Sequence, residues 1–148
     1  MISKFINMKT LHILLLLLSF SLTAQNWESD WSVATQKSKE NNQKLILVFS
    51  GSDWCIPCIK LEKEIWEDES FKTYARENYI LLRADFPKRK KNVLPKDKKA
   101  HNDKLAERFN TSGYFPLVVV ISPEEKVLGQ LGYEKSSPEK YIELINAF

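Results

Sequence analysis

The sequence predicts an α/β domain in which helices flank a central mixed β-sheet. Short apolar runs alternate with segments of helical periodicity over residues 25–148, which is typical of strands alternating with helices. The first two runs are separated by a helical segment and should therefore pair in parallel. The last two are separated only by a turn and should form an antiparallel hairpin. One sheet holding both kinds of pairing is mixed.

Residues 1–24 have the layout of a secretory signal peptide and are expected to be removed. Lys4 and Lys9 precede a mostly apolar stretch over 11–22, and Ala24 supplies a small residue at the expected cleavage site. The apolar stretch is short for a bilayer span, which needs about 20 residues. An uncleaved membrane anchor is the alternative. We therefore expect an exported protein, periplasmic or extracellular, with one domain over 25–148.

Charge and cysteine content narrow the function further. Removal of Lys4 and Lys9 lowers the net charge from +3 to +1, and a near-neutral balance argues against general nucleic-acid binding. The chain has only two cysteines, Cys55 and Cys58, so it is not a disulfide scaffold. Export would place both in a compartment where disulfides persist.

The first expected helix covers Trp27–Asn42. Asp30 is a suitable N-cap, and Trp27 and Trp31 are spaced to share one face, which we interpret as cover for the core. A buried strand follows over 45–49.

The two cysteines follow this strand, in the sequence Trp54-Cys55-Ile56-Pro57-Cys58. Helical spacing begins there and continues to Trp66, so the pair should lie in the first turn of a helix. The N–H groups of a first turn lack partners, and the helix dipole adds partial positive charge. Such a position stabilises a thiolate and lowers the pKa of a thiol. Pro57 suits a first turn, where no intrahelical N–H is needed.

Two other uses of the cysteine pair are disfavoured. A purely structural disulfide between Cys55 and Cys58 would close a very small ring and add little stability, because the stabilisation from a disulfide grows with the length of the loop it closes. A zinc site wants four ligands, and residues 25–148 offer these two thiols and one histidine, His101. We therefore predict redox use and no metal.

The second half of the chain completes the pattern. Asp68 and Ser137 are suitable N-caps, and Pro138 suits a first helical position. The expected elements are a helix over 69–78, a strand over 80–84, a helix over 98–109, a strand over 117–121, a returning strand over 126–131 and a last helix from Ser137.

Residues 87–99 are rich in lysine, with Asp97 as the one acid. We interpret them as a solvated loop leading into a helix, with a docking patch for an acidic partner or anionic lipid as the alternative. No aromatic residue interleaves the lysines, which disfavours a single-stranded nucleic-acid platform. His101 follows and should lie on the exposed face of its helix, away from any site.

The cysteine segment resembles the active-site segment of thioredoxin-fold proteins, especially secreted bacterial thioredoxin-like proteins. The resemblance is carried by Phe49–Cys58 and continues at Gly113–Pro116, Ser122–Lys126 and Gly132-Tyr133, so it covers nearly all of residues 25–148. It implies a thioredoxin fold with an extra N-terminal helix. It also implies a thiol–disulfide oxidoreductase that needs no cofactor beyond a redox-active Cys55–Cys58 disulfide.

The resemblance assigns roles to the site residues. Cys55 would attack a substrate disulfide and Cys58 would resolve the mixed disulfide. Pro116 matches the family's cis-proline, although X-Pro bonds in general are cis in only about 5–6% of cases. A cis bond would leave the backbone of Phe115 free to pair with a substrate strand. The implied substrate-binding residues are Trp54, Ile56, Pro57, Phe115 and Pro116.

Two departures from the family bear on mechanism. The usual buried aspartate and lysine are replaced by Val48 (or Phe49) and Leu81, so Glu62 or a water would have to help deprotonate Cys58. No histidine lies between the cysteines, which implies a less oxidising couple. We place its potential nearer the lower end of the range from about −270 to −120 mV.

We therefore expect a monomeric reductase of protein disulfides that draws electrons from a membrane thiol donor. A non-catalytic binding module with the same groove, and an oxidase or isomerase with the same chemistry, are the alternatives.

Overall fold

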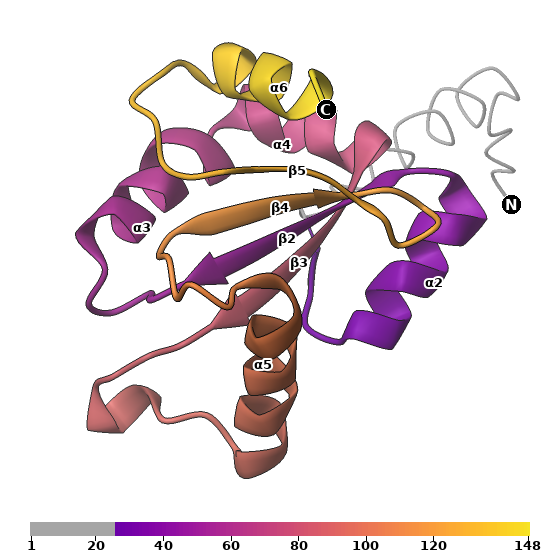
Figure 1. Cartoon of the computed structure of the whole chain (residues 1–148). Helices are drawn as coiled ribbons and strands as arrows, with labels where there is room; N and C mark the ends of the chain where they lie inside the picture. The colour runs from indigo at the N-terminus through magenta and orange to yellow at the C-terminus, as the bar shows by residue number, and fades with distance from the viewer. Residues whose placement is uncertain (1–25) are drawn as a thin grey trace, which may run out of the picture.

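The computed structural model describes residues 26–148 and contains a five-stranded sheet in the order β1-β3-β2-β4-β5 (Figure 1). β1, β3 and β2 run parallel, whereas β4 is antiparallel to both β2 and β5. The mixed sheet and the hairpin are thus confirmed. The predicted signal peptide, 1–24, lies outside the described residues. The strands are β1 (Trp27–Glu28), β2 (Lys44–Ser50), β3 (Tyr79–Asp85), β4 (Leu117–Ile121) and β5 (Val127–Leu131).

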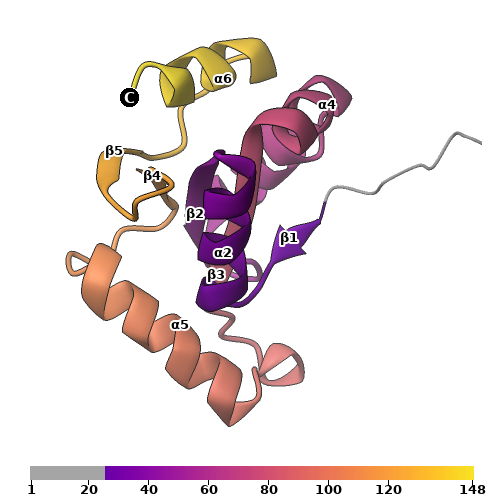
Figure 2. The ribbon, with the colours of Figure 1, turned by 90° about the vertical axis from the view of Figure 1, so that its right-hand side faces the viewer.

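Helices cover both faces of the sheet, giving three layers (Figures 1 and 2). One face packs against α3, α4 and α6, and the other against α2 and α5. This is the expected thioredoxin fold with an additional N-terminal helix. Over residues 26–148, no helix is long and apolar enough to span a bilayer. The helices are α2 (Trp31–Asn41), α3 (Ile56–Leu61), α4 (Glu69–Asn78), α5 (Lys96–Phe109) and α6 (Pro138–Asn146).

The start of the first helix differs from the prediction. Asp30 is the N-cap, as expected, and accepts a hydrogen bond from the N–H of Val33 at 3.0 Å. Its backbone is extended, however, so Trp27 cannot belong to the same helix. Trp27 instead lies in β1, where it pairs with Leu81 at the sheet edge. The i, i+4 spacing of Trp27 and Trp31 was therefore coincidental.

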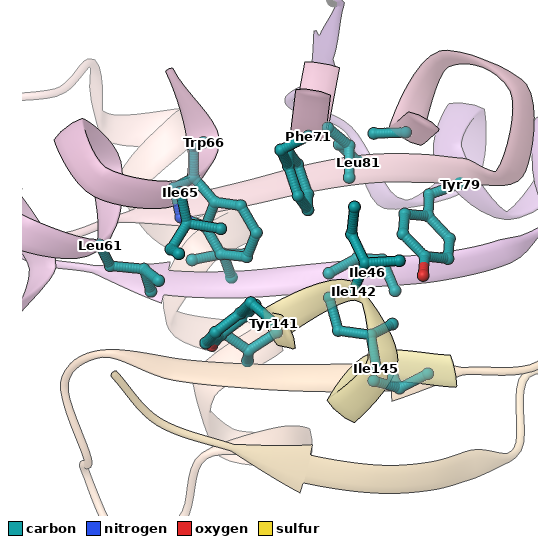
Figure 3. Close-up of a cluster of buried hydrophobic side chains, with 14 residues drawn as sticks. Ile46, Leu61, Ile65, Trp66, Phe71, Tyr79, Leu81, Tyr141, Ile142 and Ile145 are labelled. Carbon is teal, nitrogen blue, oxygen red and sulfur yellow. The ribbon is translucent and has the colours of Figure 1, made fainter. Parts of the chain in front are cut away.

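The helix that follows the cysteines widens after α3. Glu62–Trp66 forms a π-helical turn, in which the N–H of Glu67 donates to the carbonyl of Glu62 at 2.8 Å. A wider turn brings consecutive residues closer to one face, and both Ile65 and Trp66 are buried. Figure 3 shows these two side chains projecting toward Tyr141 of α6. The widened turn thus anchors the cysteine-bearing helix in the core.

Trp66 is the largest fully buried side chain of this core. Its ring meets Phe71 edge-on, with 4.7 Å between centroids, and Tyr141 with 5.4 Å. Such aromatic pairs add to the free energy gained from burial alone.

We predict that Trp66→Ala lowers the free energy of unfolding by about 3–5 kcal/mol, because it removes this contact area and leaves a cavity. Urea denaturation of the oxidised protein measures the change. Trp54→Ala is the control, since Trp54 is far more exposed and should cost less than half as much. Equal losses for the two variants would contradict this account of the core.

Candidate active site

The two cysteines lie where β2 passes into α3, as predicted. Cys55 is the N-cap of α3, and its Sγ accepts the backbone N–H of Cys58 at 3.2 Å. The two form a disulfide with a Cα–Cα distance of 5.2 Å. Pro57 occupies the first turn, where it displaces no hydrogen bond. When the pair is reduced, the same N–H group is in place to stabilise a thiolate on Cys55.

The sulfurs themselves are almost covered. Cys55 and Cys58 are each 4% exposed, and the Sγ of Cys58 accepts the N–H of Gly51 at 3.5 Å. The side chain of Cys55 therefore does not lie at an exposed edge of the helix. The N-cap sulfur turns back over the first helical turn to receive an N–H group. The exposed surface belongs to its neighbour Ile56, which is 68% exposed.

Trp54 is fixed by three neighbours. Its Nε1 donates to the carbonyl of Phe86 at 2.7 Å, and its ring meets Phe115 edge-on, with 5.4 Å between centroids. A Cβ on Gly51 would lie 2.4 Å from the ring. Only glycine at position 51 leaves room for the Trp54 ring to pack on the backbone there. The N–H of the same glycine donates to the sulfur of Cys58.

The loop before β4 lies at the same end of the sheet. Leu117 pairs with Phe49 near the end of β2, which places Pro116 beside the strand that leads to the cysteines. The Phe115–Pro116 bond is cis, as the resemblance predicted. Tyr114 protrudes from this loop and was not identified from the sequence. The side chain of Asn110 holds it in place, accepting the N–H of Tyr114 and donating to its carbonyl, each at 2.9 Å.

The lysine-rich segment is not a free loop. The Asp53 carboxylate accepts the N–H groups of Lys88 and Arg89 and the amide of Asn92, at 2.9, 3.0 and 2.8 Å. These bonds, that of Lys88 foremost, hold the pKa of Asp53 below its ordinary value. The Nζ of Lys88 lies 3.7 Å from the centre of the Trp54 ring. The segment is mostly exposed and leads into α5, as predicted for a solvated loop, and it is in addition bonded to the residues before Cys55.

The positions of the missing buried pair are apolar, as expected. Val48 and Leu81 lie buried on the α3 face of the sheet. A polar pair does occur on this face, since Arg83 of β3 contacts Glu62 at 2.7 Å. Arg83 was missed, although a lone arginine in an apolar strand was a visible signal.

Glu62 and Cys58 line one pocket of about 230 Å³. Its remaining lining comes from β2 and the loop after it, from the helix that bears Cys58, and from Arg83 of β3. Two carboxylates, those of Glu62 and Glu67, thus share one solvent-accessible hollow with the inner cysteine, and Glu62 is the one a helical turn from Cys58.

His101 has a structural role. Its Nε2 accepts the first N–H of α2, that of Trp31, at 3.0 Å. The side chain is half-buried, so the expectation of an exposed histidine was wrong, and its hydrogen bonds are to Trp31 and Asn102 rather than to either cysteine. Within residues 26–148, no group of three or more His, Cys, Asp or Glu side chains could hold a metal ion.

A disulfide at a helix start, beside a tryptophan and a cis-proline loop, is the arrangement of a protein that exchanges disulfides with thiols. Closing the Cys55–Cys58 bond releases two electrons, and opening it takes up two, so the pair can act in either direction. The fold and the site thus define a thiol–disulfide oxidoreductase.

Comparison with known proteins agrees with this class. The thioredoxin-like family model matches residues 26–123, and the chain belongs to this family. It is 32% identical over 121 residues to the disulfide bond reductase DsbH of Chlamydia pneumoniae, covering 82% of this chain and 70% of that protein. It is 31% identical over 106 residues to the thioredoxin-related protein DsbJ of the same organism, covering 72% of this chain and 30% of DsbJ.

Solved structures show the same fold. A DsbH oxidoreductase superposes with a TM-score of 0.75 at 30% identity, covering 82% of each chain. A thioredoxin from Thermus thermophilus superposes with a TM-score of 0.61 at 12% identity, covering 84% of this chain and 87% of that one. The second likeness concerns the fold alone.

Acid should release the segment that Asp53 holds. A carboxyl whose pKa is lowered by folding contributes stability that is present above its unfolded pKa and is lost as pH falls through its folded pKa. We therefore predict that the N–H groups of Lys88 and Arg89 lose protection from hydrogen exchange below about pH 4. Asp53→Ala should remove that protection at pH 7.

Amide exchange followed by NMR, corrected for the intrinsic pH dependence, measures both effects. Asp68→Ala is the control, because Asp68 caps α4 and has no contact with the segment. Unchanged protection in Asp53→Ala would show that other contacts hold the segment.

Proposed function

We propose that the protein is an exported reductase of protein disulfides, with Cys55 as nucleophile and Cys58 as resolving thiol. The observation that carries the proposal is the hydrogen bond from the N–H of Cys58 to the sulfur of Cys55. It favours negative charge on Cys55 and leaves Cys58 one turn further into the helix. The name of the relative DsbH, a disulfide bond reductase, supports the direction.

The reaction has two exchange steps. The Cys55 thiolate attacks one sulfur of a substrate disulfide, forming a mixed disulfide and releasing the first substrate thiolate. The Cys58 thiolate then attacks the sulfur of Cys55, which releases the second substrate thiolate and closes the Cys55–Cys58 bond. The substrate gains two electrons and the enzyme loses two. A donor dithiol restores the enzyme by the same steps in reverse.

Substrate would lie across the surface around Cys55. Ile56 and Trp54 supply exposed apolar area, and Pro57 continues it into the first turn. Phe115, which is half-buried, borders this surface from the loop before β4 and is followed by the buried Pro116. The backbone of Phe115 could pair with an extended substrate segment. These five residues are the proposed substrate-binding set.

The reducing direction also agrees with the residues between the cysteines. Neither Ile56 nor Pro57 is a histidine that could stabilise the thiolate. The Cys55–Cys58 couple should therefore be less oxidising than a couple with a histidine between its cysteines. A reductase outside the cytosol needs electrons from across the membrane, and we propose a membrane thiol protein as the donor. The protein would act as a monomer, with no cofactor besides its own disulfide.

We predict that insulin is reduced by the wild type in the presence of dithiothreitol, and that Cys55→Ser abolishes the added rate. The reduced Cys58→Ser variant, mixed with insulin after dithiothreitol has been removed, should instead accumulate a mixed disulfide, since the resolving thiol is missing. Insulin turbidity and non-reducing electrophoresis report the two outcomes.

Alkylation of the reduced protein tests the same assignment. Cys55 should react at a lower pH than Cys58. Two thiols that titrate like free cysteine would contradict the enzymatic role and favour a binding module. A measured potential near −120 mV, the oxidising end of the range, would contradict the reducing direction.

Glu62 is the proposed proton acceptor for Cys58. It is one helical turn beyond that cysteine and lines the same pocket. Its contact with Arg83 fixes the carboxylate at the wall of this pocket. A water in the pocket could carry the proton from the Cys58 thiol to Glu62.

We predict that Glu62→Gln slows release of substrate from the mixed disulfide by about tenfold near pH 7, with a smaller deficit at higher pH, where the Cys58 thiol ionises unaided. Stopped-flow kinetics of the resolving step across pH measures this. Glu64→Gln is the control, because Glu64 contacts the hydroxyl of Tyr133 instead. An unchanged rate and pH profile in Glu62→Gln would exclude Glu62 as the acceptor.

A further inference from the structure

A second hollow, of about 540 Å³, opens beside Trp54. Its apolar walls come from Trp54, from Phe115 of the cis-proline loop, and from Phe86, Val93 and Leu94 of the segment that follows β3. Val93 lies at its edge and is 70% exposed, so its apolar surface is available to an occupant. We call this hollow the lysine-loop pocket. It borders the proposed substrate-binding surface, because Trp54 and Phe115 belong to both.

The lysine-loop pocket is held open by hydrogen bonds. The three bonds to Asp53 fix the outer part of the segment, and the Trp54–Phe86 bond fixes its start. At the base, the side-chain amide of Asn102 donates to the carbonyl of Asp85 at 2.9 Å. A pocket that is already formed binds its occupant without an added cost of ordering the walls.

The charge around the lysine-loop pocket is positive. Lys88 and Lys99 line it, and the adjacent part of the segment carries further cations. The one lining acid, Asp85, accepts the N–H and the hydroxyl of Ser52. Lys99 contacts Asp103. Among the described residues, no ion pair with an acid is formed by Lys88, Arg89, Lys90, Lys91 or Lys96.

We infer that the lysine-loop pocket selects substrates, receiving a large apolar side chain near the substrate cysteine, with carboxylates on the same segment facing the lysines. The inference rests on the proposed function and adds a substrate class, acidic segments with an apolar anchor. Charge complementarity and continuity with the site both favour this occupant. A concave pocket beside a reactive sulfur fits a single side chain better than the flat surface of a bilayer.

The test uses disulfide-linked peptides that differ only beside the cysteine. One series places Glu, Gln or Lys around a fixed Leu, and a second replaces the Leu by Ala in the Glu peptide. We expect the wild type to reduce the Glu peptide about tenfold more efficiently than the Lys peptide, measured as kcat/KM at low salt. This ratio should fall toward one in 1 M salt, where the screening length is about 3 Å. The Leu peptide should exceed the Ala peptide several-fold.

Matched variants connect these ratios to the pocket. Lys88→Glu should invert the preference for the Glu peptide over the Lys peptide. Lys126→Glu is the control, because it makes the same change of net charge in the turn at the far end of β4. It should leave the preference unchanged. Val93→Ser should lower the Leu-to-Ala ratio toward one. Val127→Ser, also at an exposed valine but at the start of β5, should not.

The outcomes separate the inference from the proposed function. Equal efficiencies for all peptides would overturn the inference and leave the reductase intact. No reduction of any peptide would overturn the proposed function itself. Flat peptide ratios, together with Lys88-dependent binding to vesicles of anionic lipid, would assign the segment to a membrane surface and also overturn the inference.

Discussion

The redox site depends on how firmly α3 is held. The sulfur of Cys55 receives the N–H of Cys58 only while the first turn of this helix is formed. A helix this short is not stable by itself in water, because nucleation is costly. Its position is supplied by the turn that follows, which buries Ile65 and Trp66 against α4 and α6. The hydrogen bond that would stabilise a thiolate on Cys55 therefore depends on packing in the core.

The polar groups near Cys58 are placed where water can reach them. A charged pair at the positions of Val48 and Leu81 would be buried, and each charge would carry a large desolvation penalty. Arg83 lies two residues along β3 from Leu81, on the same face. It pairs with Glu62, and the side chains of the two residues are 26% and 32% exposed. The chain thus keeps a carboxylate near the inner cysteine while the strands beneath remain apolar. Proton transfer would then pass through a solvent-accessible pocket rather than through a buried relay.

The features that the sequence predicted are mostly local. Asp30, Asp68 and Ser137 cap their helices as expected, because a cap bonds to a backbone group two or three residues away. The position of the cysteine pair at the start of a helix could be predicted equally well, since a strand, the two thiols and a helical period occur within one short stretch. β1, with two residues, is too short for any periodicity to reveal.

Long-range contacts explain what the sequence could not predict. The N–H of Trp31 bonds to His101, 70 residues away, and Asp53 reaches Lys88, 35 residues away. Nothing near either residue indicates its partner. The site residues missed for this reason are the ones that fix Trp54 and the lysine-rich segment. The cis form of Pro116 was predicted only through the family resemblance, because proline itself favours trans.

The position of Trp54 connects recognition to chemistry. One ring forms a wall of the lysine-loop pocket and also lies on Gly51, whose N–H faces the sulfur of Cys58. If the lysine-loop pocket receives a substrate side chain, that side chain would lie against the ring of the residue next to Cys55, which would orient the substrate disulfide for attack. Binding at a distance from the reacting atoms accelerates a reaction in this way when it restricts them to a productive geometry. A chain with the same cysteines but a mobile segment after β3 would retain the exchange chemistry and lose that restriction.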